Sequence, residues 1–292
     1  MQEPPAKTGM AAYRDTFLNG LRRQLIRSGL DRWVQRLRAF VHFGPWRVLP
    51  RFVIRQLRRR SSDDHDAFSL LGAIDVVALV SEIRRDSVAV AGTLPSDFVA
   101  RLRAMTDRLG VDHYELMHEV DADVRRLAAD PAVCAVLREY FGCDPELLES
   151  TLVVTGAHSE LGLNDQNFFH FDYAGWESLN LFVYLTDVSA QSSCHVVATG
   201  SHSDIGLRDV FRGIISDEEA QRRYGERIHP ITGPAGTVFF ENTEAFHRRS
   251  PTDDRRVLLN LLFTSHRGIF SYGRSSQRDL TKRQKIYAQL RM

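Results

Sequence analysis

Apolar residues recur with two different periods along this chain, one in each half. Before about residue 150 the spacing is helical. It predicts helices over residues 74–85, from Ser96 onward and over 130–142, with a short strand at 87–90. Asp130 and Pro131 favour a helix start, and Gly142 favours its end.

After residue 150 the apolar period changes to two, and β-forming residues dominate. The predicted strands cover residues 151–156, 167–172, 178–185, 195–198, 237–241 and 257–264. A charged stretch, residues 207–229, predicts an insertion with a helix at 217–224. A helical layer followed by short strands favours a β-sandwich or barrel with helices on one face.

Residues 21–60 form an unusually basic segment, with twelve arginines and a single acid, Asp31. Apolar residues such as Ile26, Leu30 and Trp33 recur there at helical spacing. One interpretation is a pair of helices packed on the core with a solvated basic face. A second is a helix lying on an anionic membrane surface, and a third is a docking surface for a carrier-bound substrate. We predict a basic helical extension over 1–64 and a main domain over 65–292.

Overall charge and cysteine content exclude several classes of protein. The net charge is +1, and no nucleic-acid reading module accompanies the arginines, so no nucleic-acid partner is expected. Three unpatterned cysteines suggest a reducing compartment without disulfides or a zinc cluster. No apolar run approaches the ~20 residues of a membrane span, and residues 1–20 lack a signal-peptide core. We expect a cytoplasmic protein, peripheral on the inner face of the membrane if the basic segment binds lipid.

The chemistry centres on His170 and Asp172. Residues two apart in a strand share a face, so this imidazole and this carboxylate would point the same way. With His247 as a third ligand they would form the two-histidine, one-carboxylate triad of non-haem iron sites, which leaves positions open for oxygen and a co-substrate. A surface His–Asp pair is the plainer interpretation of the short motif alone.

Residues on the C-terminal side of this motif make it more specific. An apolar strand ends in Asp187-Val188, and the motifs Gly200-Ser201-His202 and Gly236-Thr237 come next, before His247 and Arg256. In this order, residues 70–266 resemble the phytanoyl-CoA dioxygenase family of iron(II)- and 2-oxoglutarate-dependent oxygenases. The resemblance implies a double-stranded β-helix, a jelly-roll or cupin-like barrel with flanking N-terminal helices. It also implies iron(II), 2-oxoglutarate, dioxygen and a small-molecule substrate.

Position by position, the resemblance makes His170, Asp172 and His247 the iron ligands. It makes Arg256 the partner of the distal carboxylate of 2-oxoglutarate. Arg256 shares a strand face with Leu258 and Asn260, whereas Arg255 would point away. The expected lining of the co-substrate pocket is Phe182, Asn180 and Tyr184, for which core packing is an equal alternative, and the substrate candidates are His158 and Trp176. The histidines expected to be structural are His195, His202, His229 and His266.

The presence of Asp172 favours hydroxylation of an unactivated C–H bond over halogenation, because related halogenases replace this carboxylate by a small residue. Desaturation or cyclisation at the same centre is an alternative. Another alternative is a non-catalytic, membrane-associated barrel that acts as a binding module. A metal-dependent isomerase or a cofactor-free dioxygenase on a cupin-like barrel is a further alternative. Such a site would usually lack an arginine at the position of Arg256. Departures at Phe169, at residues 191–194 and at Thr199 indicate a divergent branch, so the family's substrate is not carried over.

Overall fold

The computed structural model describes residues 37, 40–61, 68–106, 113–116, 122–155, 164–250, 252 and 254–266. The helices are α3 (Val48–Leu57), α4 (Val76–Asp86), α5 (Ser96–Thr106), α6 (Ala122–Ala128), α7 (Pro131–Phe141), α8 (Leu207–Arg212) and α9 (Asp217–Tyr224). The longer strands are β1 (Val88–Thr93), β3 (Glu146–Thr155), β5 (Ser178–Tyr184), β9 (Thr237–Glu241) and β11 (Arg256–Thr264). The shorter strands are β2 (His113–Leu116), β4 (Phe169–His170), β6 (His195–Ala198), β7 (Ile214–Ile215), β8 (Ile228–Ile231) and β10 (His247–Arg249).

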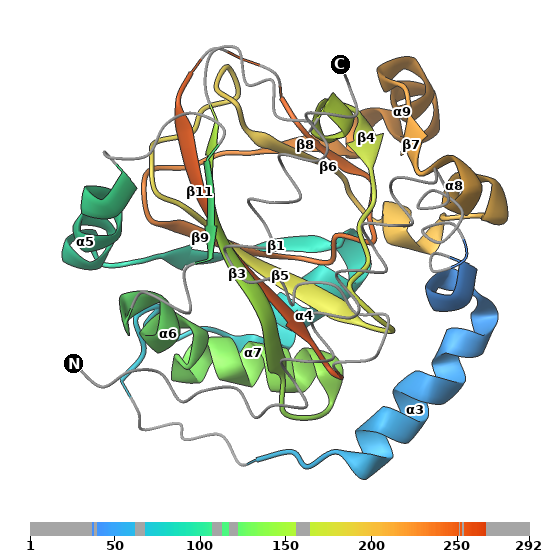
Figure 1. Ribbon diagram of the computed structural model, residues 1–292, viewed down its shortest axis with the longest axis horizontal. Coiled ribbons are helices and arrows are strands. Elements are labelled where there is room, and N and C mark those ends of the chain that lie inside the picture. The colour runs from blue at the N-terminus through green and yellow to red at the C-terminus, as the bar shows by residue number, and fades with distance from the viewer. Residues whose placement is uncertain are drawn as a thin grey trace, which may run out of the picture.

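Two antiparallel sheets form the body of the molecule (Figure 1). The larger has the order β1-β9-β5-β11-β3-β2, and the smaller has the order β7-β4-β10-β6-β8. Strands far apart in sequence are neighbours in both sheets, as expected of a jelly roll. The predicted fold class is confirmed.

Alternation along the strands divides the apolar residues between two cores. On β11, Leu259 faces outward into a core shared with α4 and α7, whereas Leu258 faces inward between the sheets. Figure 1 shows α4, α6 and α7 together at one side of the larger sheet. Because one face of this sheet packs on helices, the inner face is left to line a cavity.

The predicted elements agree with the structure where the local signal is strong. Helix α7 has Asp130 as its cap, accepting from the N–H groups of Ala132 and Val133, and ends at Gly142 with φ +72°. Strands β6 and β9 and helix α9 match the predicted ranges. The predicted strand over 167–172 is wrong in extent, because only β4 pairs within the sheet. After it the chain leaves the ladder, and the N–H of Asp172 donates to the Thr243 carbonyl (2.7 Å).

Helix α3 and the residue before it, Arg47, turn arginine side chains toward the barrel. Arg47 and Arg51 pair with Glu244 (2.8 and 3.2 Å), and Arg55 pairs with Glu177 (2.9 Å). Both acids are buried, so each needs a cation to offset the loss of water. The exposed apolar residues of this helix are Val48, Leu49, Phe52, Val53 and Leu57.

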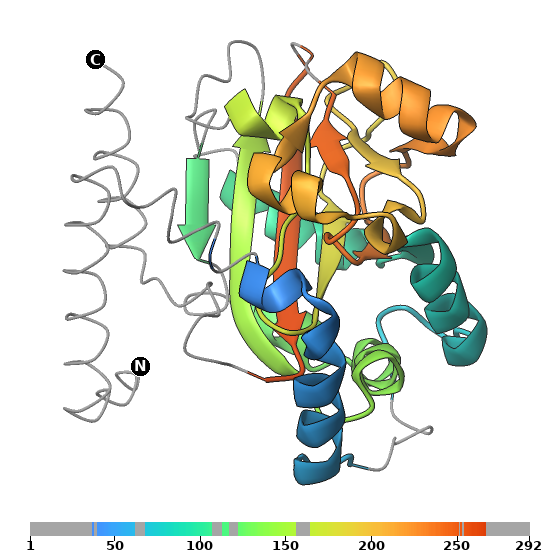
Figure 2. The ribbon, with the colours of Figure 1, turned by 90° about the vertical axis from the view of Figure 1, so that its right-hand side faces the viewer.

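Of the three interpretations of the basic segment, a solvated basic face does not hold for α3, because Arg51 and Arg55 pair with acids of the barrel. Figure 2 shows the helix outside the barrel, alongside one end of it. The rest of the predicted basic segment, residues 21–36, 38 and 39, lies outside the described residues. Among the helices that the structure describes, none combines the length and the apolar content needed to cross a bilayer.

Candidate metal centre

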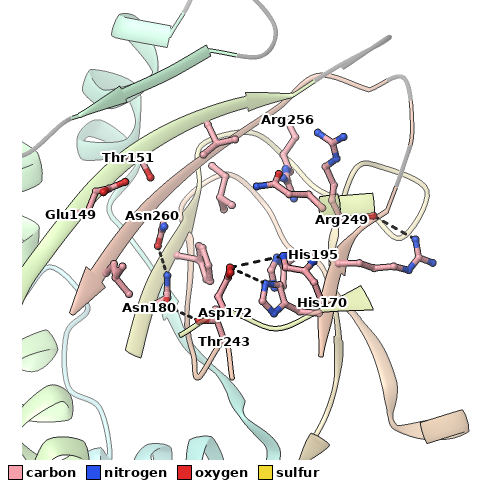
Figure 3. Close-up of a pocket in the computed structure, with 17 residues that line it drawn as sticks. Glu149, Thr151, His170, Asp172, Asn180, His195, Thr243, Arg249, Arg256 and Asn260 are labelled. Atoms are coloured by element: carbon pink, nitrogen blue, oxygen red, sulfur yellow. Dashed lines mark hydrogen bonds and ion pairs between the residues drawn. The ribbon is translucent and has the colours of Figure 1, made fainter. Parts of the chain in front are cut away.

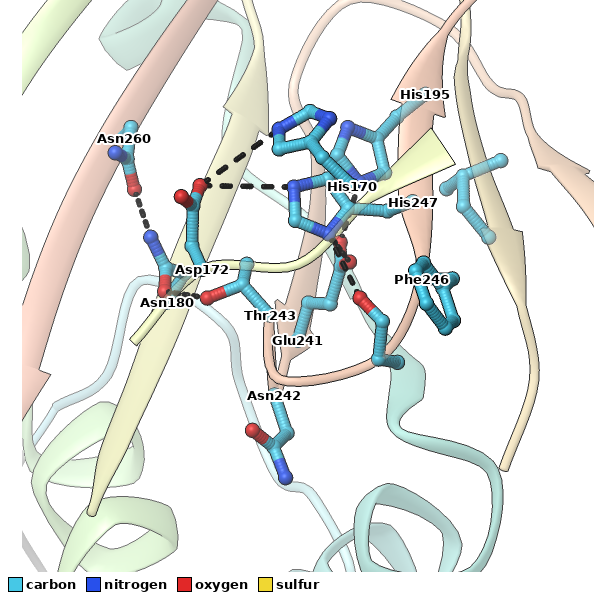
Figure 4. A network of polar contacts seen from close by, with 12 residues as sticks. His170, Asp172, Asn180, His195, Glu241, Asn242, Thr243, Phe246, His247 and Asn260 are labelled. Carbon is cyan, nitrogen blue, oxygen red and sulfur yellow. Dashed lines mark hydrogen bonds and ion pairs between the residues drawn. The ribbon is translucent and has the colours of Figure 1, made fainter. Parts of the chain in front are cut away.

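The three predicted ligands meet at one end of the space between the sheets (Figure 4). His170 on β4 and His247 on β10 are register partners, and their ring centroids lie 4.4 Å apart. The Oδ2 atom of Asp172 lies 3.9 Å from Nε2 of His170 and 3.7 Å from Nε2 of His247. Atoms that each lie about 2.1 Å from one ion are within about 4.2 Å of each other. Both distances satisfy that limit.

Backbone carbonyl groups set the orientation of both imidazoles. Nδ1 of His170 contacts the Phe168 carbonyl oxygen at 2.9 Å, and Nδ1 of His247 contacts that of Ala245 at 3.0 Å. A carbonyl oxygen only accepts, so each Nδ1 carries the hydrogen and each Nε2 keeps its lone pair. The free lone pairs point to the side of Asp172, which is the arrangement that binds a metal ion.

Burial differs across the triad. His247 is 5% exposed, whereas the side chain of Asp172 is 49% exposed. Burial, together with the neighbouring His170, lowers the pKa of His247, so the ring is neutral and able to act as a ligand. The half-exposed carboxylate marks the open end of the site.

A buried acid and a further histidine lie behind His247. Glu241 is fully buried, and its Oε2 lies 2.7 Å from Nε2 of His195, at an angle outside ordinary hydrogen-bond geometry. Its Oε1 lies 3.7 Å from Nδ1 of His247. Burial raises the pKa of Glu241 to about 7 and lowers that of His195 to about 3. Both shifts favour uncharged forms, because water is excluded from this layer.

The triad opens into a cavity of about 180 Å³ (Figure 3). Its floor is the inner face of the larger sheet, where paired residues form rows. Thr151, Asn260 and Phe182 form one row across β3, β11 and β5. Glu149 and Asn180 flank Leu262 in the next row.

A chain of hydrogen bonds ties this floor to the metal loops. The side chains of Asn180 and Asn260 are joined at 2.8 Å, and Thr243 donates to Asn180 at 3.1 Å. Thr243 belongs to the loop that leads to His247, and its carbonyl oxygen accepts from Asp172 (2.7 Å). The floor and the two loops that carry ligands therefore form one connected polar framework.

The two neighbouring arginines of the sequence separate as predicted. Arg256 is 4% exposed and lines the cavity with Leu258 and Asn260, on the inner face of β11. Arg255 is exposed and donates to the carbonyl oxygen of Thr106 (2.8 Å), outside the cavity. A further buried arginine, Arg249, also lines the cavity and is held by two hydrogen bonds to Oδ1 of Asn167.

Of the other predicted site residues, some line the cavity and some lie outside its lining. Phe182 and Asn180 line the cavity, but Tyr184 does not. The Tyr184 hydroxyl donates to the Ile231 carbonyl (2.9 Å) and accepts from the His195 N–H (3.1 Å), which ties the two sheets together. Trp176 is also outside the cavity lining and packs against His42, with ring centroids 5.0 Å apart. His158 lies outside the described residues.

Sequence reasoning missed His195 and Glu241. His195 was expected to be structural, yet it lines the cavity. In the sequence, Glu241 looks like a polar residue that simply ends an apolar strand. Strand register is the signal that could have found this pair. Glu241 is in register with Asn180, so its side chain must point into the barrel as well.

The donor set fits a ferrous ion. Two imidazoles and one carboxylate would hold one side of an ion, and the other side would face the cavity, which is the facial arrangement of non-haem iron. A buried guanidinium in the same cavity suits a carboxylate-bearing co-substrate.

No protein-family model and no curated protein matches this sequence. Solved structures match it in fold. HygX from Streptomyces hygroscopicus with nickel and 2-oxoglutarate bound is 18% identical with a TM-score of 0.51, over 65% of this chain and 87% of that chain. Its iron-bound form is 19% identical with a TM-score of 0.50, over the same shares. The epimerase SnoN with Fe3+, alpha ketoglutarate and nogalamycin RO is 20% identical with a TM-score of 0.48, over 65% and 83%. At these identities the likeness to HygX shows a shared fold, and this chain has that jelly-roll architecture.

Proposed function

We propose that this chain is an iron(II)- and 2-oxoglutarate-dependent oxygenase that hydroxylates an unactivated C–H bond of a small molecule. The observation that carries the proposal is the convergence of His170, Asp172 and His247, with both Nε2 lone pairs turned to the carboxylate. Arg256 in the same cavity supports the choice of co-substrate. The fold is shared with HygX, which has been solved with nickel and 2-oxoglutarate, and we propose membership of the phytanoyl-CoA dioxygenase-like branch of these enzymes.

Each residue has a separate task in this proposal. His170 and His247 would hold the iron as neutral ligands, and Asp172 would supply a negative charge that offsets part of the ion's charge. Arg256 would bind the distal carboxylate of 2-oxoglutarate through paired N–H donors. With these groups and dioxygen bound, the centre would supply one oxygen atom to succinate, formed together with carbon dioxide from 2-oxoglutarate, and the other oxygen atom to the substrate.

The apolar part of the cavity completes the site. Phe182 and Leu258 lie on its floor, near the arginine, and keep water away from the bound co-substrate. The half-exposed side of Asp172 leaves room for the primary substrate to approach from outside the barrel. The cavity thus has a closed end for the co-substrate, near Arg256, and an open end for the substrate, beside Asp172.

The direct test measures succinate formed from 2-oxoglutarate by the purified protein, with and without ferrous iron. We expect iron-dependent succinate formation, slow without substrate and faster when the correct substrate is present. The matched control is Asp172→Ala, which keeps the barrel but removes the acidic member of the triad. Succinate formation that is independent of iron, or equal in the variant, would rule out the proposal.

We also propose that the outer face of α3 makes a peripheral contact with a lipid surface. The observation that favours this is the row of exposed apolar side chains, among them Leu49, Phe52 and Leu57, the last 80% exposed. Co-sedimentation with phosphatidylcholine vesicles tests it. The double variant Leu49→Ser/Phe52→Ser should lose binding, and equal binding by the parent and the variant would exclude this face.

A further inference from the structure

Asp172 is the member of the triad that lies outside the strands. His170 and His247 are paired across β4 and β10, whereas Asp172 lies beyond the end of β4 and its side chain is 49% exposed. Its N–H donates to the carbonyl oxygen of Thr243 (Figure 4). The place of the carboxylate therefore depends on what holds the carboxylate segment, residues 171–177, against the histidine loop, residues 242–246.

Arg51 of α3 connects the carboxylate segment to the histidine loop. Its Nε donates to the Trp176 carbonyl oxygen (2.6 Å), and its Nη2 donates to Oε1 of Glu244 (3.2 Å). Glu244 is 3% exposed and directly follows Thr243, and its Oε2 accepts from Arg47 (2.8 Å). The several donors of one planar guanidinium allow both contacts of Arg51 at once. One side chain thus bonds to both parts of the chain that carry Asp172 and lead to the β10 imidazole.

Aromatic rings join the same two parts of the chain. Phe43, shortly before α3, packs on Phe171 and Tyr173, one on each side of the metal-binding carboxylate, with centroids 4.9 and 5.2 Å apart. Phe171 packs edge-on against Phe246, the last residue of the histidine loop, with centroids 5.5 Å apart. Such aromatic pairs contribute beyond the area that they bury. Phe43 therefore supports the contact between the direct neighbours of two metal-ligand candidates.

We propose that Arg51 and Phe43 are positioning residues of the metal site, and that they set the distance between the Asp172 carboxylate and the imidazoles. That distance is 3.7 Å from Oδ2 to Nε2 of His247. Neither Arg51 nor Phe43 lines the cavity, so each acts through the segments that it holds. The inference rests on the proposed function, since it concerns the same triad. The alternative is that these contacts only stabilise the fold.

The variant Arg51→Ala removes the connection between the two segments. The probe is Ni2+ titrated into the full-length protein, where it takes the place of iron without turnover. We expect Kd for Ni2+ to rise about tenfold, the lower end of what outer partners of metal ligands contribute. Lower global stability alone would leave this Kd unchanged while nearly all molecules stay folded, because apparent affinity falls only with the competent fraction. Circular dichroism of each sample before titration measures that fraction.

The matched control is Arg55→Ala, the same substitution one turn further along α3. Arg55 pairs with Glu177 in the carboxylate segment (2.9 Å), and among the described residues it makes no hydrogen bond to the histidine loop. This variant should bind Ni2+ like the parent. If the parent binds Ni2+ and Arg51→Ala binds it equally well, or if both variants weaken binding equally, the inference is wrong while the proposed function stands. If the parent itself does not bind Ni2+, both are wrong.

A double-mutant cycle on the same Kd shows whether Arg51 acts through Asp172. In an Asp172→Ala background, Arg51→Ala should change Kd less than about twofold, because the ligand that it positions is gone. A tenfold rise in that background too would overturn the positioning role.

Phe43→Ala tests the aromatic contact and leaves both ion pairs of Glu244 in place. It should raise Kd for Ni2+ by a similar factor to Arg51→Ala, and it gives the same comparison should Arg51→Ala fail to fold. Phe40→Ala is its control, because Phe40 packs on Trp46, outside both segments (centroids 4.8 Å apart). A Kd equal to that of the parent in Phe43→Ala would remove Phe43 from this role.

Discussion

His170 and His247 face each other across neighbouring antiparallel strands, with their Nδ1 atoms held by backbone carbonyls two residues earlier in each case. The same local geometry therefore occurs twice, once on β4 and once on β10. Because backbone atoms set both rings, side-chain substitutions nearby should leave their orientation intact. This rigidity makes the triad suited to holding one ion and makes each ligand separately testable.

Single alanine substitutions of His170, Asp172 or His247 should each weaken Ni2+ binding at least about 100-fold. Loss of a group that merely supports a ligand typically costs 10- to 100-fold, and loss of a ligand should cost no less. Isothermal titration of metal into each variant measures this. Substitution of His202 by alanine is the control, because its Nδ1 contacts Ser87 Oγ (2.6 Å) and it is outside the triad. Parent-like affinity in any triad variant would remove that residue from the site.

Arg256→Ala should raise Kd for 2-oxoglutarate by about 10- to 100-fold, because a charge-assisted, two-pronged contact is lost. Arg256→Lys should recover only part of the affinity, since an ammonium group lacks the planar fork. Arg255→Ala, one residue away but outside the cavity, is a matched control that should bind normally. Equal effects at both positions would contradict the assignment.

Arg51→Ala should lower the free energy of unfolding by about 1–3 kcal/mol, because buried Glu244 then keeps a single cation, Arg47. Urea unfolding followed by circular dichroism measures the change. In Arg227→Ala, the loss of the half-exposed Arg227–Asp204 pair should cost no more than about 0.5–1 kcal/mol. A cost in Arg51→Ala as small as in this control would show that α3 contributes little to stability.

Acid should weaken the insertion that carries α8 and α9. Burial alone would raise the pKa of Asp209, but two hydrogen bonds from Arg223 and one from the Gly206 N–H outweigh it and hold that pKa below its usual value. The stabilisation is thus present above about pH 4, the ordinary pKa of aspartate, and is lost as the pH falls through the depressed value.

Asp209→Asn should therefore cost about 1–3 kcal/mol at pH 7, and the difference from the parent should shrink toward pH 2–3. Urea unfolding of both proteins across this range measures it. Asp204→Asn, which alters a half-exposed ion pair, should show little difference at any pH. A difference for Asp209→Asn that stays constant with pH would contradict the role given to its charge.

Short-range patterns predicted much of this fold and the pairing of His170 with Asp172, whereas the choice of His247 as third ligand followed from the resemblance to the phytanoyl-CoA dioxygenase family. Strand β9 was predicted to the residue because three consecutive β-forming residues, Val238-Phe239-Phe240, follow the turn residue Gly236. Strand β10 was missed because His247, Arg248 and Arg249 carry no strand signal, and their pairing comes from β4 and β6. Asp172 reaches the site from an irregular segment rather than a strand, because its N–H donates to the Thr243 carbonyl instead of to a neighbouring strand.

Long-range pairing explains what was not predicted. Glu241 meets His195 across 46 positions of sequence, and Arg47 meets Glu244 across 197. No local pattern shows such partners, so the arginines of α3 looked like a water-facing surface. The inner face of β11 could be predicted because only alternation within one strand was needed to separate Arg256 from Arg255.

Helix α3 has a charged face toward the barrel and an apolar face on its outer side. These two faces respond to dissolved salts in opposite ways. Screening by simple salt weakens the charged attachment of α3 to the barrel. Sulfate or phosphate at high concentration instead strengthens the association of apolar surfaces, such as the outer side of this helix. The salt in the buffer therefore decides which behaviour of α3 is observed. A simple salt favours its release from the barrel, and sulfate or phosphate favours association of its outer face with another apolar surface.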